Sequence, residues 1–262
     1  MAKQRPSTRR RQQEVAALIK AGTDQVADIA EALGISPSTI RRDLASLEDL
    51  GEVTRVLGGA VPASPLAELE VDERSRVAPE AKRAIAAAAA DLIPTQAKAI
   101  FLDAGSTTGS MVPFLETHKP IKVATRGLDL ALTLSKNPEI AVQLLGGRVH
   151  WHSRSTSGPL YEIAAERLSF DVAFFGCDSV SATEGIGEPT LPEARTKELI
   201  ARRSRLNVVL AHADKLGARQ NAWAPLPRGW VLVTDERSGS ALAPFRAAGV
   251  RVISVQTAAT TK

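Results

Sequence analysis

The chain has 262 residues, 44% of them hydrophobic and 24% charged, so it can bury the core of one large domain or of two unequal ones. No apolar stretch approaches the ~18 residues that a membrane span needs, and no apolar segment follows the basic N-terminus as it would in a secretory signal. A single cysteine excludes an internal disulfide framework. We therefore expect a two-domain globular protein that resides in the cytoplasm, with no membrane partner.

The net charge of +4 is too small to indicate nucleic-acid binding by itself. Its placement is more informative, because five basic residues precede the first acid, Glu14. Such an arm could lie along phosphates and release counterions, or it could be a solubilising tail. The five residues are Lys3, Arg5, Arg9, Arg10 and Arg11.

Apolar residues at helical spacing predict three helices in the first fifty residues. The first stops at Gly22, and the second is capped by Asp24 and closed by Gly34. The third begins at residues 36–37, where serine suits the N-cap and proline the first helical position, and ends at Gly51. The residues expected to be buried are Val15, Leu18, Ile19, Val26, Ile29, Ala30, Leu33, Ile40, Leu44, Leu47 and Leu50.

A turn of three or four residues between the second and third helices predicts a helix-turn-helix motif. The third helix of the domain, which is the second helix of the motif, would enter the major groove by its N-terminal half, where hydroxyls reach phosphates and arginine pairs with guanine. The alternating segment 52–61, with a glycine pair typical of a hairpin turn, predicts a wing. A helical bundle on a larger enzyme is the alternative. The expected DNA contacts are Ser36, Ser38, Thr39, Arg41, Arg42, Arg55, Gly58 and Gly59.

Residues 63–75 are rich in proline, alanine and acids and are expected to link domain 1–62 to domain 76–262. A strongly helical run at 80–93 is followed by β-like stretches that alternate with helical ones, which predicts an α/β domain with a mainly parallel sheet. The expected strands are 98–103, 121–125, 141–146, 171–176, 206–211, 230–234 and 250–254.

Ligands of parallel α/β sheets bind at the carboxyl ends of the strands. The segment 103–110 follows the first strand and is small and rich in hydroxyls, so it suits a phosphate or is an ordinary capped turn. It lacks the lysine of a P-loop and the glycine spacing of a dinucleotide site. Glu193 and Lys197, one helical turn apart, could face this edge or form a surface pair. Cys177 is more typical of a buried apolar position than of a nucleophile.

Segment 36–61, SPSTIRRDLASLEDLGEVTRVLGGAV, resembles the N-terminal signature of the DeoR family of bacterial transcription regulators. FLDAGSTT, LLGGRV, GCDSV, EARTK and ADKLG resemble the sensor domain of the same family, so the resemblance covers almost the whole chain. It implies a Rossmann-like sheet related to ribose-5-phosphate isomerase and the CoA transferases, and a phosphorylated sugar or similar effector. The effector residues it implies are Asp103, Gly105, Ser106, Thr107, Thr108, Arg126, Gly146, Asp178, Glu193, Lys197, Asp214 and Lys215.

Four residues depart from the family pattern. Leu57 replaces the usual histidine of the wing, Ser179 a glycine and Leu216 a phenylalanine. Arg126 replaces the usual asparagine, and its permanent charge and planar fork suggest an effector with extra negative charge. A surface ion pair with Asp129 is the alternative.

The sequence thus predicts a winged helix-turn-helix repressor of carbohydrate-related genes that binds double-stranded operator DNA as a homo-oligomer, under control of a phosphorylated effector. We expect no catalytic residue, cofactor or metal. Two other interpretations stay open: a sugar-phosphate isomerase fused to a DNA-binding domain, with Asp103, Glu193 and Lys197 as acid/base residues, and an interaction scaffold that binds no metabolite.

Overall fold

The computed structural model describes residues 8–20, 22–49, 53–56, 58–62, 71–118 and 120–256. The chain divides into two compact units, 1–68 and 69–262. The division falls within the predicted linker, and residues 71–75 of that linker are helical. Among the described helices, none is both long and apolar enough to cross a membrane.

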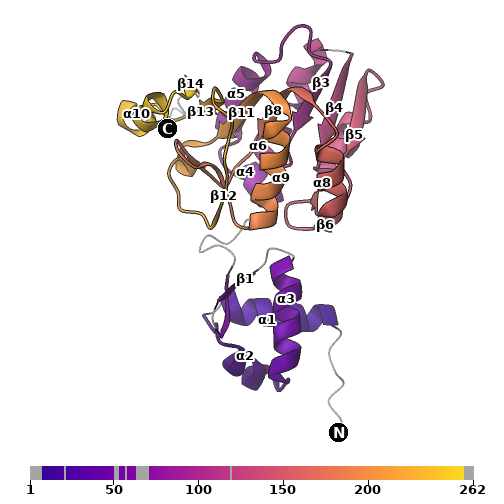
Figure 1. Ribbon diagram of the computed structural model, residues 1–262, viewed down its shortest axis with the longest axis vertical. Coiled ribbons are helices and arrows are strands. Elements are labelled where there is room, and N and C mark those ends of the chain that lie inside the picture. Colours follow the sequence, from indigo (N-terminus) through magenta and orange to yellow (C-terminus); the bar gives the residue numbers. More distant parts are fainter. Residues whose placement is uncertain are drawn as a thin grey trace. The chain divides into compact units, whose positions relative to one another are not determined.

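The N-terminal unit contains the three predicted helices and the predicted wing (Figure 1). A core of apolar side chains joins the three helices to both strands of the hairpin, through Val53 and Ala60. Most residues expected in this core are buried there or pack against it, and Leu50 lies outside the described residues. The elements are α1 (Thr8–Lys20), α2 (Val26–Leu33), α3 (Pro37–Asp49), β1 (Val53–Val56) and β2 (Gly59–Pro62).

The turn between α2 and α3 forms as the sequence indicates. Gly34 has a φ of 63°, the left-handed conformation that favours glycine after a helix, and the Ile35 N–H donates to the Ala30 carbonyl at 2.9 Å. The Ser36 hydroxyl accepts from the Thr39 N–H at 3.3 Å, which caps α3. The expected cap of α2 is wrong, because Gln25 occupies the N-cap position in place of Asp24.

Part of the basic N-terminal segment belongs to the helical core. Arg11 lies in α1 and donates through Nε and a terminal nitrogen to Asp43 of α3, at 2.5 and 2.9 Å. Asp43 is buried, so this bidentate ion pair holds α1 against α3. Arg10 forms an exposed pair with Glu14 at 3.2 Å, and Lys3 and Arg5 lie outside the described residues.

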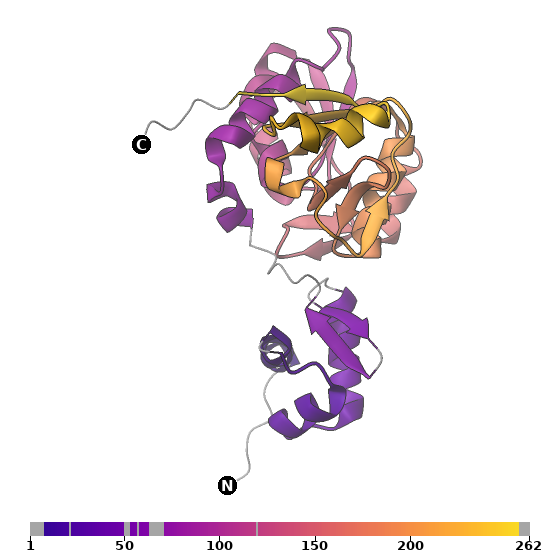
Figure 2. The ribbon, with the colours of Figure 1, turned by 90° about the vertical axis from the view of Figure 1, so that its left-hand side faces the viewer.

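Backbone hydrogen bonds connect the wing to the start of α2. Strands β1 and β2 pair antiparallel beside α3 (Figure 2). The Ala60 N–H donates to the Asp24 carbonyl at 2.8 Å, and the Val26 N–H donates to the Gly58 carbonyl at 3.0 Å. A Cβ on Gly59 would lie 1.8 Å from that Asp24 oxygen, so the backbones approach to a distance that only glycine permits.

We expect Gly59→Ala to lower the free energy of unfolding of the N-terminal unit by about 1–3 kcal/mol, because the added methyl must push two hydrogen-bonded backbones apart. Urea unfolding followed by circular dichroism measures the change. Gly239→Ala is the control, since a Cβ there meets no atom within 4 Å. Equal stabilities of the two variants would contradict this account of the wing.

The C-terminal unit is built on a seven-stranded sheet in the order β14-β13-β11-β8-β3-β4-β5, with every neighbouring pair parallel. All seven predicted strands are confirmed. The chain winds outward from β3 in both directions, so the order reverses between β3 and β8. The strands are β3 (Ala99–Leu102), β4 (Ile121–Thr125), β5 (Ile140–Leu144), β8 (Phe170–Phe175), β11 (Ser204–Ala211), β13 (Val231–Thr234) and β14 (Arg251–Ser254).

Two apolar clusters, one on each face, hold the sheet between layers of helices (Figure 1). Strand side chains alternate between them: Ile100 and Leu102 join one cluster and Phe101 the other. One face is covered by α5 (Pro79–Ala90), η1 (Val112–His118) and α7 (Leu128–Leu134), and the other by α8 (Pro159–Ala165), α9 (Leu191–Arg202) and α10 (Gly239–Ala247).

Several short elements were not foreseen from the sequence. A hairpin pairs β6 (Arg148–His150) with β7 (Ser155–Ser157), and β7 bonds back to the residue after β4 through the Thr156 N–H and the Arg126 carbonyl at 3.0 Å. The others are α4 (Val71–Arg76), β9 (Ser179–Ser181), β10 (Gly185–Glu188), η2 (Ala213–Lys215) and β12 (Ala222–Ala224). Most carry residues of the site below. The short helix α6 (Ser106–Gly109) follows the first strand, where the sequence predicts a helical stretch.

Candidate DNA interface and effector site

The N-terminal half of α3 presents two arginines to solvent. Arg41 and Arg42 are exposed, and within the described part of the chain neither forms a hydrogen bond or ion pair. Ser38 is exposed and Thr39 half-buried beside them, and both hydroxyls lie within 3.0 Å of the Ser36 hydroxyl. This end of α3 therefore offers free guanidinium groups next to hydroxyls, as a recognition helix requires.

The wing contributes fewer candidates than expected. Arg55 and Gly58 are exposed, and the Arg55 N–H donates to the Glu48 carboxylate of α3 at 3.2 Å. Gly59 is buried against Asp24, so its position is explained by packing inside the domain. Leu57, the departure from the family pattern, lies outside the described residues.

In the C-terminal unit, Asp103 follows β3 and is the centre of a buried charge cluster. Arg126, at the end of β4, donates from Nε to Asp103 at 2.6 Å and from a terminal nitrogen to the Ser155 hydroxyl at 3.1 Å. Both side chains are buried. Burial favours the neutral acid, but Arg126 and Lys197 outweigh it and hold the pKa of Asp103 below its usual range. The alternative interpretation of Arg126, a surface ion pair with Asp129, is wrong, because Arg126 is buried and its partner is Asp103.

Lys197, on α9, completes this cluster. Its Nζ lies 3.3 Å from Asp103, donates to the Gly176 carbonyl at 2.8 Å and pairs with Glu188 of β10. Glu193 accepts from the Thr190 hydroxyl at 2.9 Å at the start of the same helix, and both Glu193 and Lys197 are buried. Glu193 and Lys197 are therefore not an exposed surface pair, and among the described contacts they do not pair with each other.

Glu188 makes the stability of this unit depend on pH. Burial raises its pKa to about 8 against the attraction of Lys197. The folded state then keeps a proton that the unfolded state has released, so this contribution to stability is complete below about pH 4.5 and is lost as the pH rises through about 8. We expect the unfolding free energy to fall, relative to Glu188→Gln, by on the order of a few kcal/mol from pH 5 to 8.

Urea unfolding at pH 5, 6.5 and 8 measures this difference. Glu184→Gln, which changes an exposed carboxylate in the turn before β10, should show no such trend against the wild type. A pH-independent difference between the wild type and Glu188→Gln would mean that Glu188 is ionised beside Lys197 throughout.

A second charged group lies after β8. Asp178 is 3.2 Å from Lys215 and 3.7 Å from Arg74 of α4. Lys82 of α5 donates to the Arg74 carbonyl, and burial, with the nearby charges of Arg74 and Lys215, lowers the pKa of Lys82 to about 8. These contacts fasten α4, the first element of the unit, to the sheet edge. The sequence did not single out Arg74 or Lys82.

The side chains of other predicted effector residues do not join the charge clusters around Asp103 and Asp178. The Asp214 side chain is 84% exposed and lies 3.4 Å from His212, and Gly146 is exposed. Thr108 is buried and donates to the Asp103 and Gly105 carbonyls at 2.8 and 3.1 Å, so its hydroxyl shapes the loop from inside. Burial raises the pKa of Cys177 to about 12, which keeps it a thiol at neutral pH.

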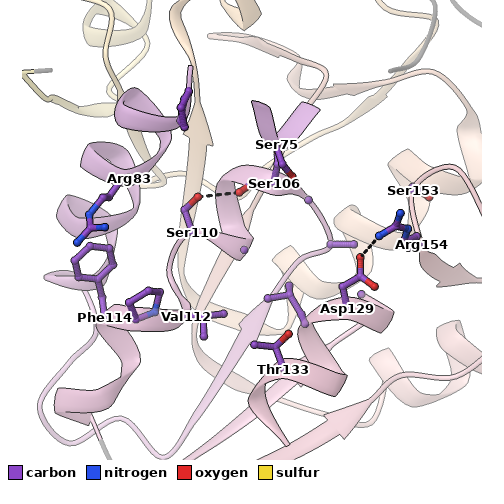
Figure 3. Close-up of a pocket in the computed structure, with 17 residues that line it drawn as sticks. Ser75, Arg83, Ser106, Ser110, Val112, Phe114, Asp129, Thr133, Ser153 and Arg154 are labelled. Atoms are coloured by element: carbon purple, nitrogen blue, oxygen red, sulfur yellow. Dashed lines mark hydrogen bonds and ion pairs between the residues drawn. The ribbon is translucent and has the colours of Figure 1, made fainter. Parts of the chain in front are cut away.

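A pocket of about 590 Å³ opens beside the loop that follows β3, beyond the carboxyl ends of β3 and β4 (Figure 3). Its volume is in the range of small-molecule sites. Of the predicted effector residues, Gly105 and Ser106 line it. Asp103 and Lys197 do not, which weakens their candidacy as the acid and base of an isomerase. Ser110, in the predicted phosphate-binding segment 103–110, also lines the pocket, and the polar lining residues that sequence reasoning missed are Ser75, Arg83, Asp129, Thr133, Ser153 and Arg154.

Two arginines lie on opposite sides of the pocket (Figure 3). Arg83 of α5 is 6.0 Å from the centre of the Phe114 ring. Arg154, in the β6–β7 turn, lies 3.0 Å from the Asp129 carboxylate and has a φ of 46°. A non-glycine residue in the left-handed region is strained, and such strain collects at functional sites. The Arg83 guanidinium can attract an anion, whereas the charge of Arg154 is balanced by Asp129.

A winged helix-turn-helix unit followed by a parallel α/β unit with a polar pocket at its strand ends defines a ligand-sensing DNA-binding regulator. Residues 10–65 match the DeoR-like helix-turn-helix domain, and residues 77–236 match the DeoR C-terminal sensor domain. The chain belongs to the DeoR family of transcriptional regulators. The helical bundle of an enzyme, the alternative interpretation of the N-terminal region, is therefore wrong.

Relatives include the HTH-type transcriptional regulator GlpR of Haloferax volcanii, 34% identical over 74% of this chain and 76% of the relative. The lactose phosphotransferase system repressor of Streptococcus mutans is 31% identical over 86% of this chain and 91% of the relative. Among solved structures, ribose 5-phosphate isomerase A from Neisseria gonorrhoeae matches 53% of each chain at 18% identity, with a TM-score of 0.36.

Proposed function

We propose that this regulator represses genes of carbohydrate use and that a phosphorylated sugar or similar metabolite, bound in the C-terminal unit, controls its affinity for the operator. The observation that carries the proposal is the hydroxyl- and arginine-lined pocket at the strand ends of the unit that matches the DeoR sensor domain. A relative named as the repressor of the lactose phosphotransferase system supports genes of carbohydrate use as the targets.

The operator would be read by the exposed end of α3. Arg41 and Arg42 would pair with guanine edges, while hydroxyls at 36–39 reach phosphates. The wing would add Arg55 and the backbone at Gly58, both of which are exposed. In this proposal the predicted domain 1–62 binds DNA, residues 63–75 are the linker, and domain 76–262 binds the effector.

Effector control requires a difference in affinity. A ligand shifts the equilibrium only as far as it prefers one state, so an inducer must bind the DNA-free state more tightly than the DNA-bound one. Operators read by helix-turn-helix proteins usually have paired half-sites, which favours a homo-oligomer. We place this activity in the cytoplasm, where operator DNA and phosphorylated metabolites meet.

A gel shift of the full chain on the DNA upstream of its own and neighbouring genes, with and without a panel of sugar phosphates, tests the proposal. We expect a shifted band that one compound releases. Absence of any shift would contradict the assignment of the recognition helix. A shift that no phosphorylated compound changes would contradict effector control and favour the scaffold interpretation.

A further inference from the structure

The pocket has two ends of different electrostatic character. At one end Arg83 is exposed and, within the described residues, has no carboxylate partner, so this end carries a net positive charge. At the other end the charge of Arg154 is balanced by Asp129, 3.0 Å away. Figure 3 shows Arg83 on one side, the Asp129–Arg154 pair on the other, and Ser106 with Ser110 between them.

These two ends favour different chemical groups. An anion is attracted to Arg83 and to the nearby Ser106 hydroxyl, whereas close to Asp129 it would meet a like charge. A carboxylate next to a guanidinium offers an acceptor beside donors, which is the pattern that a sugar hydroxyl satisfies because it both donates and accepts. Ser153 and Thr133 add hydroxyls on the same side.

The hydroxyl-binding end is also fixed in position. The Arg154 carbonyl accepts from the Leu128 N–H at 2.8 Å, and the Arg154 N–H donates to the Trp151 carbonyl at 3.3 Å. These bonds hold the left-handed backbone of Arg154 and keep its guanidinium next to Asp129, which lies one residue beyond Leu128. A side chain fixed before binding loses less entropy when a ligand arrives, which improves both affinity and discrimination.

We propose that the pocket binds a phosphorylated polyhydroxy compound in one orientation, with its phosphate at Arg83 and Ser106 and its remote hydroxyls read by Asp129 and Arg154. Asp129 is then the residue that distinguishes a sugar phosphate from another phosphate ester. This inference rests on the proposed function, since it names the orientation and the selecting residue for the same effector.

Isothermal titration of the full chain with inorganic phosphate, n-pentyl phosphate and a set of pentose and hexose phosphates tests it. We expect wild type to bind its best sugar phosphate at least about tenfold more tightly than pentyl phosphate, the gain expected from a hydrogen bond to a charged group. Asp129→Asn should lose most of this preference while keeping its affinity for inorganic phosphate. Arg83→Ala should weaken all phosphates, by about fivefold or more, and keep the preference.

The control is Glu184→Gln, an exposed carboxylate outside the pocket, which should leave both properties unchanged. An unaltered preference in Asp129→Asn, or unaltered phosphate binding in Arg83→Ala, would overturn the proposed orientation. Equal binding of pentyl and sugar phosphates by wild type would overturn it as well. Failure of the proposed function appears elsewhere, as operator binding that no sugar phosphate releases; failure of the orientation alone leaves that release intact.

Discussion

The double variant Arg41→Ala/Arg42→Ala is expected to lose specific operator binding while its fold is retained. Both side chains are exposed at the N-terminal half of α3 and bond to no described residue, so their removal leaves no unpaired group inside the domain. An arginine that pairs with a guanine contributes about 1–3 kcal/mol, and the loss of both should weaken specific binding by about two orders of magnitude or more. Fluorescence anisotropy with labelled operator at fixed salt measures the change.

The matched control is Arg246→Ala, which removes an exposed arginine from α10 of the other unit. It should bind operator as wild type does. Circular dichroism of the double variant must show an unchanged helical spectrum. Operator affinity within a factor of two of wild type, in a folded double variant, would mean that another surface reads the DNA.

Asp103→Ala is expected to destabilise the sensor unit by about 3–5 kcal/mol, because it leaves Arg126 and Lys197 buried without their shared counter-charge. The carboxylate lies 2.6 Å from Arg126 and 3.3 Å from Lys197, and all three side chains are less than 5% exposed. Urea unfolding of the full chain, followed by tryptophan fluorescence, measures the loss, since all three tryptophans belong to this unit.

Asp129→Ala is the control, because it removes the same kind of side chain from an aspartate–arginine pair that is half exposed. Solvent screens that pair, and the expected loss is at most about 1 kcal/mol. If the two variants were equally stable, Asp103 would belong with the ligand-contacting groups that its sequence position suggested, and the buried cluster would not support the fold.

Periodicity and turn chemistry were enough to predict the three N-terminal helices, the wing and the seven strands of the parallel sheet, but not the short elements at its edge. The apolar residues of the first fifty recur at helical spacing, Gly34 and Ser36 mark the turn between two helices, and each of the seven strands is a short apolar run of β-formers. These signals are local, because each depends on residues within one or two turns of each other. The family could also be inferred at this level, since its motifs are contiguous segments.

Tertiary structure decided which side chains meet. Arg126 lies 23 residues from Asp103 and Lys197 lies 94 residues from it, and the order of the sheet strands brings them together. Folding also buries Glu193 and exposes Asp214. Their positions in the sequence did not show which of these two predicted effector residues would be buried. Arg83 and Arg154 line the pocket because α5 and the β6–β7 turn, far apart in the sequence, lie on opposite sides of it. Local sequence determined the main helices and strands, whereas the site depends on short connecting elements and on long-range packing that no local pattern encodes.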